Sequence, residues 1–166
     1  MVSPELLRRY PFFSCLSHDQ LATLAMAGRE ISVEAGHRFF QEGDKLRYMY
    51  FLLEGNIDIT IGVPDRTAEQ DFRDQIMGNF IAKDIAVSYI VPGQLFAWSA
   101  MIPPHTSTAG AVSVYSSRVV AFDCEALMQV FQEDCQFGTL MLQKVAKVIR
   151  ARLRDMRIQS LAFVPA

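Results

Sequence analysis

The hydrophobic pattern changes twice along this chain of 166 residues. Over 1–28 the apolar residues follow helical spacing, and Ser17 supplies an N-cap signal, which predicts short N-terminal helices. Over 29–123 the apolar residues gather in short β-rich runs, separated by turn signals at Glu54-Gly55-Asn56 and Pro92-Gly93. Helical spacing returns over 124–160. The pattern predicts helices, sheet and helices in that order, within a single domain spanning 1–166.

The central runs predict an antiparallel β-roll or jelly-roll barrel, so the expected fold class is mainly β with flanking helices. The runs read REISV, HRFFQ, RYMYFLL, NIDITIGV, DIAVSYIV, TAGAVSV and RVVAFD. Short strands at close spacing with tight turns are typical of small sandwiches and barrels. Alternate positions belong to inward faces of such strands. The residues assigned to those faces are Tyr50, Leu52, Ile57, Ile59 and Ile61.

Residues 64–84 interrupt the strands with a polar stretch that is longer than a hairpin requires. We interpret this stretch as an insertion. It is either a solvated hairpin or short helix without a role, or a functional loop.

Composition and charge limit the classes of partner. The chain has 16 Lys and Arg against 18 Asp and Glu, a formal charge of −2, which lacks the basic excess of nucleic-acid and membrane-surface binders. No stretch approaches the roughly 18 apolar residues of a membrane span, and the N-terminus lacks the apolar region of a signal peptide. Cys15, Cys124 and Cys135 form no CxxC pair, which favours a reducing compartment. We expect a cytoplasmic protein without nucleic-acid or membrane partners.

The glycines of the first strands, with the stretch EGDKLRYMYFLLEGNIDI, resemble a known family. This order resembles the cyclic-nucleotide-binding domain shared by catabolite-activator-type regulators, protein-kinase regulatory subunits and gated channels. The matching positions are Leu21, Leu24, Gly36, Glu42, Gly43, Asp44, Tyr50, Leu52, Leu53 and Gly55. The resemblance covers nearly the whole chain and implies a β-roll that senses a ligand, without enzymatic activity.

Residues 93–113 resemble the phosphate-binding cassette of that family, with substitutions at its charged positions. Phe96 matches the family phenylalanine, whereas Ala97, Trp98 and Ser107 stand where the family has a glycine, a glutamate and an arginine. The resemblance implies that the arginine binds the cyclic phosphate and the glutamate binds the ribose hydroxyl. Losing an ionic partner weakens binding by about 2 to 4 kcal/mol, or roughly 30-fold to 1000-fold. We predict a degenerate ligand site.

Uncharged hydrogen-bond donors remain around this cassette. Backbone N–H groups at the turn into 98–102 and three hydroxyl groups are available, and His105 is a candidate cation near neutral pH. Two interpretations stay open: a small anion binds through these groups, or Trp98 fills the pocket and the Ser/Thr cluster caps turns. A positive φ at Ala97 would cost about 1 kcal/mol. The candidate ligand-binding residues are Gly93, Phe96, Ala97, Trp98, Ser99, His105, Thr106, Ser107 and Thr108.

The long C-terminal helix carries an apolar stripe, with basic residues on its other faces. The stripe comprises Met141, Leu142, Val145, Val148, Ile149, Leu153 and Met156. We predict a parallel homodimer through 142–156, as in the bacterial regulators of the resembled family; the alternative is packing on the chain's own barrel. No residues after this helix build a helix-turn-helix, so we expect no direct DNA binding.

The leading functional hypothesis is a stand-alone sensor or regulatory module that signals through dimerisation or a protein partner. The alternative is genuine binding of a cyclic nucleotide, cAMP or cGMP, or of another small anion through backbone amides and the hydroxyls of 106–108. A third hypothesis, a cupin-type metal enzyme, is disfavoured because His18, His37 and His105 are scattered and form no H-x-H pair. Ser99 lacks a nucleophile elbow. We expect no catalytic residues, no metal site and no cofactor other than a cyclic nucleotide.

Overall fold

The computed structural model describes residues 2–64 and 82–161. The elements are α1 (Pro4–Arg8), the 3-10 helix η1 (Pro11–Phe13), α2 (His18–Ala27), β1 (Gly28–Val33), β2 (Arg38–Phe40), β3 (Tyr48–Glu54), β4 (Ile57–Pro64), β5 (Ala82–Ile90), β6 (Leu95–Phe96), the 3-10 helix η2 (Trp98–Met101), β7 (Gly110–Ser113), β8 (Ser117–Asp123), α4 (Cys124–Glu133) and α5 (Cys135–Leu161). The predicted order of helices, sheet and helices is confirmed. Both ends of the expected insertion 64–84 belong to β4 and β5, and its residues 65–81 lie outside the described residues.

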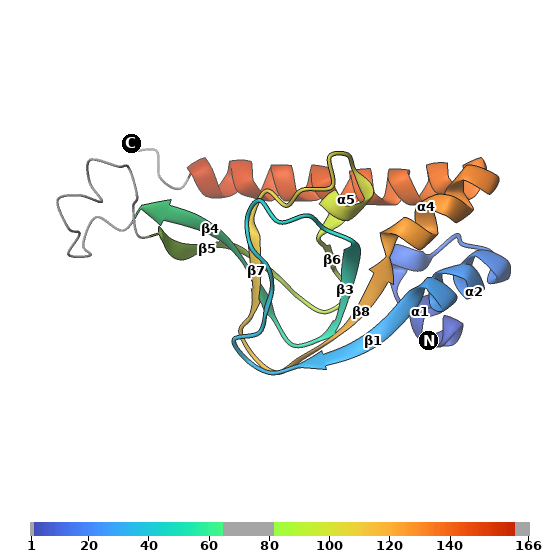
Figure 1. Cartoon of the computed structure of the whole chain (residues 1–166), viewed down its shortest axis with the longest axis horizontal. Coiled ribbons are helices and arrows are strands. Elements are labelled where there is room, and N and C mark those ends of the chain that lie inside the picture. Colours follow the sequence, from blue (N-terminus) through green and yellow to red (C-terminus); the bar gives the residue numbers. More distant parts are fainter. Residues whose placement is uncertain (1, 65–81, 162–166) are drawn as a thin grey trace.

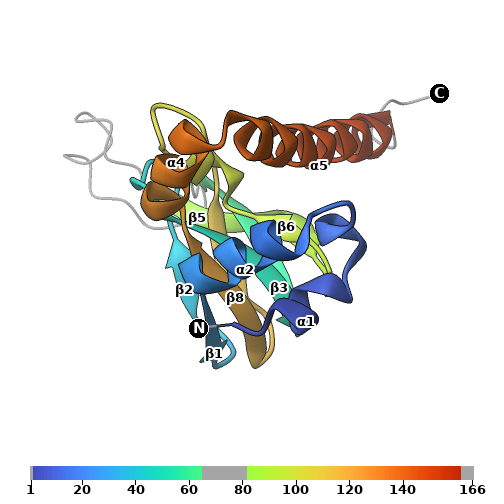
Figure 2. The ribbon, with the colours of Figure 1, turned by 90° about the vertical axis from the view of Figure 1, so that its right-hand side faces the viewer.

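The strands form two four-stranded antiparallel sheets, in the orders β1-β8-β3-β6 and β2-β7-β4-β5. This arrangement confirms the predicted mainly β roll. The two-residue strand β6, which pairs with Tyr50 and Phe51 of β3, was not predicted, because so short a segment has no measurable periodicity. Figure 1 shows α5 running along one side of the roll, and Figure 2 views the end covered by α1 and α2.

Strand β3 contributes to two separate hydrophobic cores. Met49, Phe51 and Leu53 pack beneath the helices, whereas Leu52 points into the interior of the roll, where Tyr50 packs against the same cluster. Successive strand residues point to opposite faces, so a strand covered on both sides is apolar at nearly every position. The unbroken apolar run of β3 is explained by this position between the helices and the second sheet.

Local chemistry sets the ends of several elements. Ser17 and Gln20 form a reciprocal capping box that starts α2. Gly55, between β3 and β4, has a φ of 98°, and a Cβ at this residue would lie 2.8 Å from Ser117 Cα. Only glycine combines that dihedral angle with so close an approach of two backbones.

The first part of α5 is built into the core beside α4. Gly138 brings the two helices together, because a Cβ there would lie 2.9 Å from Cβ of Phe131. The rings of Phe131 and Phe137 pack edge to face with centroids 5.0 Å apart. Met141 and Val145 continue this buried face along the helix. None of the described helices combines the length and apolar content that a membrane crossing requires.

Candidate functional site

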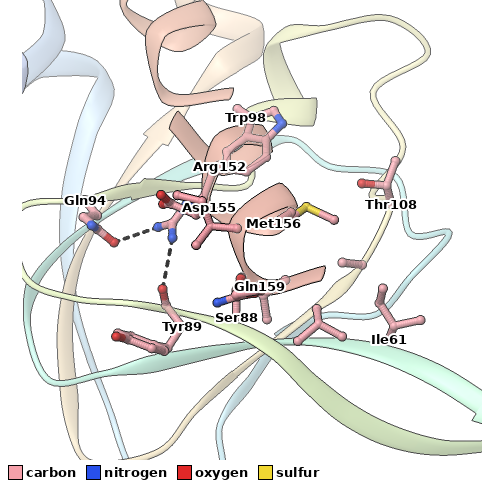
Figure 3. A pocket seen from close by; sticks show the side chains of 14 residues that line it. Ile61, Ser88, Tyr89, Gln94, Trp98, Thr108, Arg152, Asp155, Met156 and Gln159 are labelled. Carbon is pink, nitrogen blue, oxygen red and sulfur yellow. Dashed lines mark hydrogen bonds between the residues drawn. The ribbon is translucent and has the colours of Figure 1, made fainter. Parts of the chain in front are cut away.

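A cavity of about 530 Å³ lies between the β4–β5 hairpin, η2 and the C-terminal part of α5 (Figure 3). Its walls combine aliphatic and aromatic side chains with polar and charged ones. The lining residues are Ile59, Ile61, Val87, Ser88, Tyr89, Gln94, Trp98, Thr108, Ala109, Arg152, Asp155, Met156, Ile158 and Gln159. A cavity of this size with an apolar wall and a few convergent polar groups is typical of small-molecule sites.

Trp98 forms part of the cavity wall at the start of η2. The preceding residue, Ala97, adopts the left-handed conformation with a φ of 59° and a ψ of 33°. An alanine in this conformation costs about 1 kcal/mol relative to glycine. The left-handed turn at Ala97 sets the direction in which the chain enters η2. The indole is partly buried, packs against the core beneath the helices and also faces the cavity. The cavity therefore stays open beside the indole.

Arg152 enters the cavity from α5, beside the β5–β6 connection. Its Nη1–H donates to the Tyr89 carbonyl oxygen at 3.2 Å, and its Nη2–H donates to Gln94 Oε1 at 2.7 Å (Figure 3). Burial lowers the pKa of this guanidinium, while the nearby Asp155 carboxylate acts in the opposite direction. Within residues 2–64 and 82–161, no carboxylate lies within ion-pair distance of Arg152.

Arg152 was not singled out in the sequence analysis. A signal for it exists in the spacing of Met141, Val145, Val148 and Arg152, which advances by four, three and four residues. That spacing places all four residues on one helical face. An arginine that continues the buried face of an amphipathic helix is a candidate for a polar contact inside the fold.

The comparisons with known proteins agree with this architecture. The profile of the cyclic nucleotide-binding domain matches residues 30–134. The chain belongs to the cyclic nucleotide-binding domain family. The CRP-like cAMP-activated global transcriptional regulator of Mycobacterium tuberculosis is 20% identical over 146 residues, covering 88% of this chain and 58% of that relative. This chain thus spans less than two thirds of the curated relative's length.

Two solved structures show the same fold. A protein of Geobacter metallireducens, described as a cyclic nucleotide-binding protein, aligns with a TM-score of 0.74 and 28% identity over 92% of this chain and 99% of its own. A cyclic nucleotide-binding domain of Methylobacillus flagellatus aligns with a TM-score of 0.75 and 15% identity over 98% of this chain and 82% of its own. The fold of this cyclic nucleotide-binding domain is the Crp/Fnr-like β-roll.

Of the nine predicted ligand-binding residues, the cavity brings together Trp98 and Thr108. Phe96 is fully buried inside the roll and stacks on Tyr50 with centroids 5.2 Å apart. Ser107, at the position of the family arginine, is buried; its hydroxyl donates to the Gln41 carbonyl oxygen. Its backbone N–H and C=O are also paired, with Asp44 and Gly43. Ser107 therefore joins the cassette to the β2–β3 connection.

The remaining predicted residues make contacts with backbone groups, Gly93 with strand β3 and Ser99 and Thr106 within the cassette. The Gly93 N–H donates to the Leu52 carbonyl oxygen at 2.8 Å, and the Thr106 hydroxyl contacts the Pro104 carbonyl oxygen at 3.4 Å. The Ser99 carbonyl accepts the Ile102 N–H at 3.1 Å within the same turn. These backbone contacts are those expected of turn residues.

His105 lies apart from the cavity that holds Trp98. Its Nδ1 is 2.9 Å from the Ala100 carbonyl oxygen, and the ring faces a second cavity of about 460 Å³ beside α4. Cys124 lines that second cavity, and burial raises the pKa of its thiol to about 12. A thiol with so high a pKa is protonated near neutral pH and is a poor nucleophile. Among the described residues, no cluster of three or more His, Cys, Asp or Glu is placed to hold a metal ion.

Proposed function

We propose that this cyclic nucleotide-binding domain is a non-enzymatic, cytoplasmic sensor module that binds a small molecule in the cavity beneath α5 and signals through the outer face of that helix. The observation that carries the proposal is that one helix serves two surfaces. Arg152 and Gln159 face the cavity, whereas Leu142 and Leu153 are exposed on the outside. A ligand in the cavity contacts α5 directly, so binding changes how firmly the helix is held.

The altered cassette lacks the charged contacts of the family, so we expect cyclic nucleotides to bind only weakly. Ser107 supplies no positive charge, and its hydroxyl and backbone groups are hydrogen-bonded within the chain. The Thr106 hydroxyl contacts a neighbouring carbonyl, which leaves Thr108 as the cassette hydroxyl at the cavity. Anion binding through all three hydroxyls of 106–108, the alternative hypothesis, would require two of these contacts to break.

The output that we propose is a parallel homodimer through the outer face of α5. Met141 and Val145 are buried in the chain's own core, so they are not available to a second copy. On the outer side of α5, apolar positions advance by four and three residues, which is the spacing of a coiled-coil seam. This outer seam comprises Leu142, Ala146, Ile149, Leu153 and Met156; of these, Ile149 is half-buried and also packs against the core, and Met156 also lines the cavity. Leu142, Leu153 and Met156 are 45%, 47% and 56% exposed.

The experiment that tests the ligand part uses the single tryptophan of the chain as reporter. Because Trp98 lines the cavity, its fluorescence responds to occupancy. We expect titration calorimetry with cAMP and cGMP to give weak binding, in line with the roughly 30-fold to 1000-fold loss expected from the missing ionic contacts. Submicromolar affinity for either nucleotide would contradict the proposed weak site.

The experiment that tests the sensor part is hydrogen exchange of α5 with and without a compound that the cavity binds. We expect slower exchange over 150–161 on binding, because the ligand adds contacts to this part of the helix. The Trp98→Phe variant serves as the control for the fluorescence signal. Binding that leaves the exchange of α5 and the oligomeric state unchanged would overturn the sensor proposal.

A further inference from the structure

We infer that Arg152 is the anion anchor of the cavity, so the ligand of this sensor is an organic anion with a carboxylate or phosphate group on an apolar body. The inference rests on the proposed function and names the ligand class for the same cavity. It assigns the anchor to α5 and not to the cassette, where Ser107 stands at the position of the family arginine.

The positive charge of Arg152 is unbalanced within the described residues. Arg152 is partly buried, and its two hydrogen-bond partners are neutral oxygens, the Tyr89 carbonyl and Gln94 Oε1. None of the described carboxylates forms an ion pair with it. A guanidinium in a protein stays protonated, so a partly desolvated one is stabilised by an anion that enters beside it.

The guanidinium of Arg152 also has more hydrogen-bond donors than its described partners use. A guanidinium has five N–H donors in a planar fork. Two hydrogen bonds, to Tyr89 and to Gln94, use its two terminal nitrogens within the described chain. The donors that remain match the paired oxygens of a carboxylate or phosphate.

The guanidinium of Arg152 is held in place before any ligand arrives. Gln94 Oε1 accepts a hydrogen bond from Arg152 and another, of 3.2 Å, from the Val91 N–H. The Gln94 backbone N–H in turn donates to the Val91 carbonyl oxygen at 3.2 Å. A charged group fixed by such contacts loses little conformational freedom on binding, which favours affinity.

The rest of the cavity selects an apolar body. Ile59, Ile61, Val87 and Trp98 line it together with Met156, and its volume of about 530 Å³ admits a compact ring system. In Figure 3 the labelled Met156 and Ile61 lie on the side of Arg152 away from Gln94. The ligand therefore places its acidic group at Arg152 and its apolar part against these side chains.

The neighbouring carboxylate limits the charge that the site tolerates. Asp155 lines the same cavity one turn along α5 and is exposed, so solvent screens much of its repulsion. A ligand with a single negative charge meets less of this repulsion than one with two. We therefore expect a carboxylate to bind at least as well as a phosphate monoester.

The test compares matched acids and amides by titration calorimetry, with Trp98 fluorescence confirming the location. The probes are adamantane-1-carboxylate, its neutral carboxamide and cyclohexyl phosphate, which do not absorb where tryptophan does. We expect the carboxylate to bind at least about tenfold more tightly than the carboxamide, because a hydrogen bond to a charged group contributes more affinity than a neutral one. Equal affinity of acid and amide, or no binding of the acid at millimolar concentration, would overturn the inference.

Arg152→Gln separates an anion anchor from a purely structural link between α5 and β5. If Arg152 binds the anion, the variant weakens carboxylate binding about tenfold more than carboxamide binding, because loosening of the helix affects both probes alike. If Arg152 only positions the helix, both probes weaken equally, which contradicts the inference. Arg154→Gln, on the exposed side of α5, is the matched control, and thermal denaturation verifies that each variant folds.

The same set of proteins distinguishes this inference from the proposed function. Loss of acid selectivity, with a bound probe still slowing hydrogen exchange in α5, defeats the anion anchor and leaves the sensor intact. Selective acid binding at Arg152 without any change in α5 defeats the sensor and leaves the anion anchor intact. The affinity of cyclohexyl phosphate, compared with that of the carboxylate, shows which of the two acidic groups the site prefers.

Discussion

The two halves of α5 differ in what holds them to the rest of the molecule. Over 135–149 the helix is part of the core, with Phe137, Met141 and Val145 at most 1% exposed. Over 150–161 none of the described residues is buried, and two hydrogen bonds from Arg152 connect this segment to the roll. Local stability follows the number of buried apolar contacts, so the first half is fixed and the second half responds to the cavity.

This difference shows how one helix joins a rigid fold to a sensing site. Ligand contacts at the second half add a few kcal/mol at most, which is too little to rearrange a packed core. They are large enough to slow the local opening of a helix segment that few contacts hold.

The same substitution in the two halves gives the strongest contrast. Met141→Ala removes a fully buried side chain, and we expect it to lower the free energy of unfolding by about 2 to 5 kcal/mol. Met156→Ala removes a side chain that is 56% exposed, and we expect a change of less than about 1 kcal/mol. Urea denaturation of both variants measures this contrast. Equal losses would mean that the two halves are held alike.

The outer seam is tested by Leu153→Asp, which places a charge in the proposed dimer contact. We expect this variant to weaken dimerisation by about 2 kcal/mol or more, because it removes the burial of one leucine per copy. Light scattering across a concentration series measures the dimer. Since Lys147, Arg150, Arg154 and Arg157 flank the seam, we also expect added salt to strengthen the dimer. A monomer at all micromolar concentrations would contradict the homodimer.

Lys144 ties the fixed half of α5 to the N-terminal segment. Its Nζ donates to the Phe12 and Ser14 carbonyl oxygens at 2.8 and 2.6 Å. Burial lowers the pKa of this amine, so desolvation offsets part of the gain from these bonds. We therefore expect Lys144→Met to lower the free energy of unfolding by about 1 kcal/mol.

Lys147→Met is the matched control for that experiment, because Lys147 is exposed on the same helix. Limited proteolysis of the N-terminal segment is the second readout. It is expected to be faster in Lys144→Met and unchanged in Lys147→Met. Unchanged stability and unchanged proteolysis in Lys144→Met would show that the amine contributes nothing to holding this segment.

A local effect is expected in the second half of α5 when no ligand is bound. Arg152→Gln removes the contacts to Tyr89 and Gln94, and we expect hydrogen exchange over 150–161 to become faster, by an amount equivalent to about 1 kcal/mol. Exchange over 137–149 is expected to stay unchanged. Faster exchange in both segments would show that α5 opens as one unit.

The strands and helices could be predicted well because their signals are local. The capping box at Ser17 and the strand runs from REISV to RVVAFD need only neighbouring residues to be recognised. Strand β6 was missed because two residues have no period, and the double burial of β3 was missed because its alternation was assigned to one inward face.

The candidate site was predicted only in part, because a cavity joins segments that are distant in sequence. The resemblance predicted ligand contacts for Trp98 and Thr108, which line the cavity. It predicted them equally for Ser107 and His105, whose side chains lie elsewhere. Arg152, some 50 residues further along, has no cassette motif around it. Its role depends on where α5 packs.

The sequence by itself determined the order of the elements, the turns that require glycine and the family, since periodicity and backbone sterics act over a few residues. It also determined that α5 is amphipathic. Only the tertiary structure decided which of its apolar residues are buried, Met141 and Val145, and which stay exposed, Leu142 and Leu153. The physical reason is that a helix with apolar residues on two sides has more than one face to bury, and long-range packing against the roll selects one of them.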